Sequence, residues 1–200
     1  WNSAQTVTVT GVDDNIIDGT IASTITIAVN DGSSDNNFDP VNDQTVSVNT
    51  TDNDVAGFTI AQSGGSTSVA ETGTTDTFTA VLNAQPASNV VLSISSADTG
   101  EATVTSSLTF TSANWNTPQT VTVTGVDDNL IDGTQTTTIT AAVLDVVSDD
   151  AFDSVADQTV SVTTTDNDVA GFTIAQTGGS TSVNESGNTD TFTVVLNAQP

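Results

Sequence analysis

A long internal repeat constrains this chain more than any other feature. Residues 1–15 read WNSAQTVTVTGVDDN, and residues 115–129 read WNTPQTVTVTGVDDN, so the copies lie 114 residues apart. The similarity continues without insertion or deletion to residues 86 and 200. Roughly three positions in four are identical, far more than shared strand propensity would produce. A period of this length fits a sandwich domain of about 100 residues and is too long for a solenoid unit.

The repeat divides the chain into three parts. Residues 55–168 make one complete unit, residues 1–54 correspond to the C-terminal half of a unit, and residues 169–200 to the N-terminal part of the next. We therefore expect the chain to be a segment of a longer tandem array. Because a site of unique chemistry gains nothing from near-identical copies, the repetition favours a role in which the array supplies length and stiffness.

Within the complete unit, apolar residues alternate with Thr and Ser at a period of two, which predicts strands buried on one face and no helix. We expect seven strands, at residues 57–71 (broken at Gly64), 75–83, 89–96, 102–111, 119–125, 134–144 and 158–165. The inward positions are Phe58, Ile60, Phe78, Ala80, Leu82, Val90, Leu92, Ile94, Val121, Val123, Ile139, Ala141, Val160 and Val162. The pattern predicts an all-β fold of tandem immunoglobulin-like, seven-stranded antiparallel sandwiches. Trp1 and Trp115, just before the fifth strand, are expected to pack rather than bind a ligand.

The charge of the chain has no internal balance. It contains 25 acidic residues and no Lys, Arg or His, for a formal net charge of −25. This sign excludes a nucleic-acid partner and disfavours an anionic membrane. Cys is also absent, so bound metal is the cross-link that remains to stabilise the fold. We expect no membrane insertion, because no stretch has about 18 consecutive apolar residues, and we expect any export signal to lie outside this segment.

If the strands alternate in direction, four connections lie at one pole of the sandwich. They carry seven carboxylates, at Glu71, Asp98, Asp127, Asp128, Asp132, Asp166 and Asp168. The corresponding residues of the partial copies are Asp13, Asp14, Asp18, Asp52, Asp54 and Glu185.

Such a cluster predicts Ca²⁺, which takes 6–8 oxygen ligands at about 2.3–2.6 Å, whereas Mg²⁺ needs a tighter octahedron and Zn, Cu and Fe lack their usual His and Cys. The alternative is that these residues are solvated turn formers. For two further acids near this pole, Asp76 and Glu101, we favour that second interpretation.

Three motifs in this order resemble the Calx-beta domain, the calcium-binding module of sodium/calcium exchangers, integrin β4 and many bacterial surface proteins. They are Val-x-Glu-x-Gly at 69–73, Asp-Asp-Asn-x-x-Asp-Gly at 127–133, and Asp-Asn-Asp at 166–168. The resemblance implies that the seven carboxylates of the complete unit bind calcium. Asp132 stands where the exchanger domains usually have Glu, and Asn53 and Asn167 interrupt what is there an all-acidic triplet. The Ser/Thr-rich, Lys-free composition is similar to the repeats of type-I-secreted bacterial adhesins.

These features together predict calcium-stiffened extender repeats in the stalk of an extracellular, cell-surface adhesin, with neighbouring repeats of the same chain as partners. The alternatives are a subunit of an extracellular filament or sheath, where copies pack laterally, and a calcium-sensing or ligand-binding module. An enzyme is not expected, because His, Cys, Lys and Tyr are all missing. We also hypothesise that the loop with Asp149 and Asp150 lends a carboxylate to the metal site of the preceding repeat.

Overall fold

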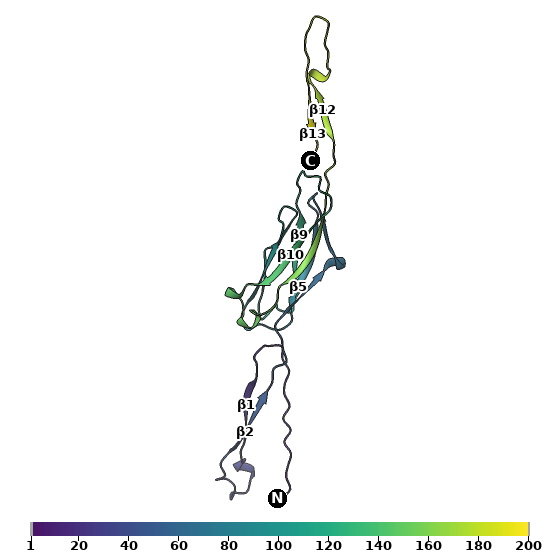
Figure 1. The fold of residues 1–200 in the computed structure, drawn as a ribbon. Coiled ribbons are helices and arrows are strands. Elements are labelled where there is room, and N and C mark those ends of the chain that lie inside the picture. Colours follow the sequence, from purple (N-terminus) through teal and green to yellow (C-terminus); the bar gives the residue numbers. More distant parts are fainter. Residues whose placement is uncertain (1, 200) are drawn as a thin grey trace.

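The computed structural model describes residues 2–199, which fold almost entirely into strands, turns and loops. Figure 1 shows three parts in chain order: a hairpin with an extended N-terminal arm, a sandwich, and a second hairpin. Among these residues no helix is long and apolar enough to cross a membrane. Trp1 lies outside the described residues, whereas Trp115 is partly buried against the core, as the sequence predicts.

The complete unit is a sandwich of two sheets. One sheet has the strand order β4-β11-β10-β6-β8 and the other β3-β5-β9-β7. The strands are β3 (Phe58–Gln62), β4 (Thr67–Ala70), β5 (Thr75–Leu82), β6 (Val90–Ser96), β7 (Ala102–Val104), β8 (Ser107–Phe110), β9 (Gln119–Gly125), β10 (Gln135–Val143) and β11 (Gln158–Thr165). The short 3₁₀ turns of this unit are Ser63–Gly65, Asp145–Val147 and Asp150–Phe152. The predicted all-β sandwich class is confirmed.

Two of the seven expected strands change sheets along their length, so the unit has nine strand segments. The first strand divides into β3 and β4 around Gly64, whose φ of 65° suits glycine. The fourth divides into β7 and β8, a break that the sequence analysis missed. There the N–H of Thr105 donates to the Thr122 carbonyl of the four-stranded sheet, at 3.1 Å. The next carbonyl, that of Ser106, accepts from Ile94 of the five-stranded sheet, at 2.8 Å.

The core lies between the sheets and contains nearly all of the predicted inward positions. Ile60 is only partly buried, and the other thirteen are buried. The sequence analysis missed six other core residues, namely Val69, Ala84, Ala102, Leu108, Phe110 and Phe152. The two largest, Phe110 at the end of β8 and Phe152 in a 3₁₀ turn between β10 and β11, are fully buried. The Asp149 side chain accepts a hydrogen bond from the Ala151 N–H and so caps the turn that carries Phe152.

The partial copies keep the local pairing of the complete unit. β1 (Ile21–Ile27) pairs with β2 (Gln44–Thr50) as β10 pairs with β11, and β12 (Phe172–Gln176) pairs with β13 (Phe192–Leu196) as β3 pairs with β5. Their 3₁₀ turns are Asp31–Ser33 and Thr177–Gly179. Each hairpin lacks a facing sheet within the described residues, so its apolar side chains are exposed. The division of the chain at residues 54/55 and 168/169 stays a prediction.

Two equivalent glycines, Gly125 and Gly11, allow a test of how closely β4 packs against β9. A Cβ at Gly125 would lie 2.1 Å from the backbone oxygen of Ala70, whereas a Cβ at Gly11, the same position in the first copy, meets nothing closer than Thr50 Cγ2 at 3.7 Å. Because backbone cannot yield as a side chain can, we expect Gly125→Ala to lower the free energy of unfolding by about 2 kcal/mol or more. Gly11→Ala should change it by less than about 0.5 kcal/mol.

Urea unfolding followed by Trp115 fluorescence, in a Trp1→Phe background, measures both effects. Equal stability of the two glycine variants would contradict the packing of β4 against β9.

Candidate metal centre

The pairing of β4 with β11 brings two acidic residues to the same pole. These strands run parallel, and their last paired residues are Ala70 and Thr165. Parallel strands that end together release their chains at one edge, so Glu71 and Asp166 follow side by side. The Glu71 N–H donates to the Thr165 carbonyl at 3.1 Å, which holds this exit in register.

The pairing of β7 with β9 brings further carboxylates to this pole. The first residue of β7, Ala102, pairs with the last residue of β9, Gly125. Glu101, just before β7, therefore lies beside Val126, just after β9. The Val126 N–H donates to the Glu101 carbonyl at 2.9 Å. Asp128 and Asp132 lie in the loop that continues from Val126 to β10. The acids thus meet because of strand register.

Two groups of three carboxylates result from this arrangement. Glu71, Asp166 and Asp168 form one group, and in each group the candidate ligand oxygens lie within 4.8 Å of one another. Glu101, Asp128 and Asp132 form the other. Two neighbouring groups that could each hold a cation therefore lie at one pole.

Burial of Glu71 and of single oxygens of Glu101 and Asp168 distinguishes these groups from ordinary surface acids. Glu71 is only 1% exposed, and its sole hydrogen-bond donor among the described residues is the Asn167 N–H, 3.0 Å from Oε2. Glu101 Oε2 and Asp168 Oδ2 are buried and find no hydrogen-bond partner within residues 2–199. Buried carboxylate oxygens without a donor or a cation are strongly unfavourable. Since the chain has no Lys, Arg or His, a bound metal ion is the partner that these atoms fit.

Other carboxylates shape the loops that carry the groups. Asp166 accepts from the N–H of Gly133 at 2.8 Å and from the N–H of Asp168 at 2.6 Å. Asp128 Oδ1 accepts from the Leu130 N–H at 2.6 Å. These hydrogen bonds fix the backbone around the two groups of carboxylates.

The environment raises the pKa of three carboxyls in these groups. At Glu71 the Asn167 hydrogen bond lowers the pKa, but burial and repulsion from Asp166 outweigh it and the net direction is upward. Burial, with repulsion from neighbouring carboxylates, raises the pKa of Glu101 and of Asp168. In contrast, backbone N–H donors hold the pKa of Asp166 below its ordinary value.

The structure brings together most of the predicted ligands of the complete unit, but not all. Asp127 lies at the rim, where its Oδ1 accepts from Asn167 Nδ2 at 2.7 Å. Asp98 is exposed and belongs to neither group, and its Oδ1 accepts from the Gly100 N–H within its own turn. Glu101, which we interpreted as a solvated turn residue, is a group member instead. The sequence signal that could have identified Glu101 as a candidate ligand was its position directly before a predicted strand at this pole. Asp76 accepts from Ser68 N–H and Thr77 N–H and so braces β4 against β5.

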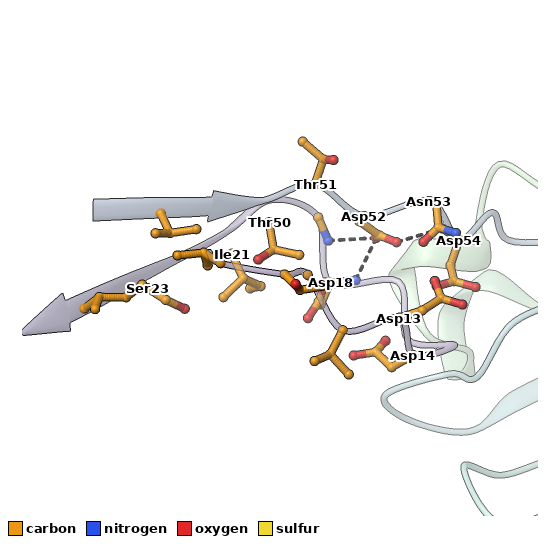
Figure 2. Close-up of a pocket in the computed structure, with 17 residues that line it drawn as sticks. Asp13, Asp14, Asp18, Ile21, Ser23, Thr50, Thr51, Asp52, Asn53 and Asp54 are labelled. Carbon is orange, nitrogen blue, oxygen red and sulfur yellow. Dashed lines mark hydrogen bonds between the residues drawn. The ribbon is translucent and has the colours of Figure 1, made fainter. Parts of the chain in front are cut away.

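The first partial copy repeats half of the site (Figure 2). Asp52 accepts from the N–H groups of Asp18, Gly19 and Asp54 at 2.8–3.0 Å, as Asp166 does for its neighbours. Asp13 and Asp14 approach Asp54 around a hollow of about 520 Å³. The pKa of Asp52 is lowered by its backbone donors, and burial and repulsion from Asp52 raise the pKa of Asp54. Glu185 is exposed in the other partial copy, and the structure does not gather it with other acids.

Comparisons with known proteins assign no family to this chain. No protein-family model matches the chain, and no curated protein matches it. Similar solved structures include domains 4 and 5 of the S-layer protein SbsC, at 25% identity and a TM-score of 0.37, covering 61% of this chain and 52% of that chain. The apo-form Calx CBD1 domain has 11% identity and a TM-score of 0.38, covering 56% of this chain and 98% of that one.

A Bacteroides ovatus GH5 xyloglucanase in complex with a XXXG heptasaccharide is also similar, at 14% identity and a TM-score of 0.37. It is matched over 55% of this chain and 19% of that chain. At such low TM-scores these likenesses carry no argument about family or function, and this chain spans only part of two of the three proteins.

The pKa directions predict how acid affects the metal-free chain. A carboxyl whose pKa is higher in the folded state contributes stability below its unfolded pKa and loses that contribution as the pH rises through its folded pKa. Glu71, Glu101 and Asp168 act in this way. We therefore expect the melting temperature in EDTA to rise as the pH falls from 7 toward about 4.5. Below about pH 4, protonation of groups such as Asp166 should reverse the trend.

Excess calcium should invert this slope, because protons then compete with the metal for the same oxygens. Calorimetric melting at a series of pH values, with EDTA or calcium, measures the two slopes. Parallel slopes would contradict a metal site at this pole.

Proposed function

We propose that this chain is a stretch of calcium-stiffened structural repeats from the stalk of an extracellular bacterial adhesin. The observation that supports it best is the burial of Glu71, together with the unpartnered oxygens of Glu101 and Asp168, in a chain without a single cationic side chain. A surface that only needed solubility would leave its carboxylates in water. Carboxylates held close together, with some of their oxygens buried, fit a role in binding a cation.

Calcium is the cation that suits these groups. Both contain carboxylate oxygens only, and the chain supplies no imidazole or thiolate for zinc, copper or iron. Ca²⁺ accepts a variable number of oxygens in flexible geometry, and Mg²⁺ requires a stricter octahedron with several waters. Glu71, Asp166 and Asp168 would hold one ion, and Glu101, Asp128 and Asp132 a second. Bound there, the ions would neutralise the charge that otherwise opposes packing at this pole.

The two carboxylate groups lie close to the joint between consecutive copies. Asp168 ends the unit, and only Val169 and Ala170 separate it from the Gly171 that opens the next copy. An ion beside so short a joint limits the directions in which the following domain can swing. This role needs no catalytic group. Millimolar calcium outside the cell would make the stalk rigid after secretion, when the chain leaves the low-calcium cytosol.

Calcium should therefore stabilise the chain strongly. At about 100 times its dissociation constant a ligand adds about 2.7 kcal/mol per site, so two sites should raise the melting temperature by more than about 10 °C. Differential scanning calorimetry with calcium, magnesium and EDTA tests this. EDTA should abolish the rise, and magnesium should give a smaller one. An unchanged melting curve in calcium would rule out the proposed role.

A matched pair of substitutions tests the ligand assignment. Glu71→Gln keeps an acceptor for the Asn167 N–H but removes a buried charge, so we expect calcium affinity to fall at least tenfold. The metal-free melting temperature should rise, because repulsion within the group is relieved. Glu185→Gln is the same change in the third copy, where no group forms, and should leave both quantities as they are. Isothermal titration calorimetry measures the affinities, and equal effects of the two substitutions would contradict the assignment.

A further inference from the structure

Both joints between copies are made by the same backbone contact. In the first joint the Gln85 N–H donates to the Asn15 carbonyl at 2.7 Å, and Ile16 forms a parallel bridge with Gln85. In the second joint, 114 residues on, the Gln199 N–H donates to the Asn129 carbonyl at 2.6 Å, and Leu130 bridges Gln199. The contact forms whether the following copy is a whole sandwich or only the β12–β13 hairpin. It is therefore a property of these two short segments.

The loop segment at residues 15–17, with its copy at 129–131, is called the docking loop below. In the first joint its last residue, Ile17, is partly buried and packs against the core of the following sandwich. Ile17 thus belongs to one unit by sequence and to the next by packing. At the second joint the equivalent Ile131 is 43% exposed, because residues 169–199 form a hairpin without a sandwich core for it to pack against.

The receiving segment is built as a fixed surface. Gln85 lies between Ala84 and Pro86, which are both buried. The Gln85 side chain donates from Nε2 to the Ser112 carbonyl at 2.9 Å, and the Asn83 N–H donates to the Gly57 carbonyl at 2.9 Å. These contacts hold the Gln85 backbone in place, and its N–H is free to donate to a neighbouring segment. Adding a short parallel strand to an exposed backbone edge is a recognised mode of protein association.

In the acidic loop between β10 and β11, Asp149 makes its hydrogen bonds within its own domain. Asp149 Oδ2 accepts from the Ser88 N–H at 2.9 Å and Oδ1 from the Ala151 N–H at 3.1 Å. Both oxygens of Asp149 thus accept hydrogen bonds within the sandwich. The hypothesis that this loop lends a carboxylate to the preceding metal site stays a prediction. The contact that the structure shows at the joint is that of the docking loop.

We propose that each unit is completed by the docking loop of the unit before it, so that stability passes along the array from the N-terminal neighbour to the C-terminal one. The partner of the receiving surface is another copy of the same domain, joined in a fixed register and direction. Ile17 is the apolar anchor, and the Gln85–Asn15 hydrogen bond sets the register. This inference goes beyond the proposed function, because the docking contact contains no metal ligand.

The test compares the same substitution at the two joints. In the 200-residue chain with Trp1→Phe, Ile17→Ser should lower the melting temperature of the complete sandwich, read by Trp115 fluorescence, by on the order of 5 °C. Ile131→Ser changes the loop of the complete sandwich itself, whose receiving neighbour is only a hairpin, and should lower it by less than about 1 °C. Ile17→Val should retain most of the stability. All variants are measured at one calcium concentration.

Amide hydrogen exchange supplies a second measurement. The Gln85 N–H should be protected in the parent chain and exchange at least about tenfold faster in Ile17→Ser. Unchanged melting and unchanged Gln85 protection in Ile17→Ser, or an equal loss in Ile131→Ser, would overturn the docking proposal. If calcium does not change the melting temperature of the parent chain but Ile17→Ser lowers it more than Ile131→Ser does, the calcium role is refuted and the docking proposal stands.

Discussion

Repulsion between carboxylates is the constraint that the rest of this structure has to satisfy. No cationic side chain of the chain can balance it. With a formal net charge of −25 and no Lys, Arg or His, each contact that brings acids together costs free energy, on the order of several kcal/mol for a pair about 4 Å apart at intermediate dielectric. The sandwich nonetheless brings six of them together, because parallel pairing of β4 with β11 and antiparallel pairing of β7 with β9 end at one pole. The strand pairing that makes the fold also produces the repulsion, and a divalent cation bound at this pole would relieve it.

The same loop connects this pole to the joint between domains. Asp128 and Asp132 are members of one carboxylate group, and the three residues between them form the docking loop, whose Asn129 carbonyl accepts from Gln199 of the following copy. Fixing both ends of so short a segment also restricts its centre, since few backbone conformations satisfy both. A metal at the pole and a neighbour at the joint would therefore act on one element. This connection gives a physical basis for a stiff array built from small domains with short joints.

Sequence patterns predicted the sandwich and most of its core, because period-two alternation indicates which face of a strand is buried. They were weaker where a residue's neighbour is distant in the chain. Asp98 and Glu101 lie three residues apart in one turn, and only the pairing of Ala102 with Gly125 turns Glu101 toward the pole while Asp98 caps its own turn. The change of sheet at Thr105 and Ser106 was likewise invisible, since both residues suit a strand and only their partners differ.

One heptapeptide occurs in two structural contexts and shows what the sequence determines and what the tertiary structure decides. Gln-Thr-Val-Thr-Val-Thr-Gly occurs at residues 5–11 and again at 119–125. The second copy is β9, paired with β5 and β7, and its Val121 and Val123 are fully buried. The first copy forms no strand, and its Val7 and Val9 are 72% and 50% exposed. Alternation determined which side chains can face a core and where acids can gather. The presence of neighbouring strands decided whether a core forms at all, because a strand's hydrogen bonds and most of its burial come from residues elsewhere in the chain.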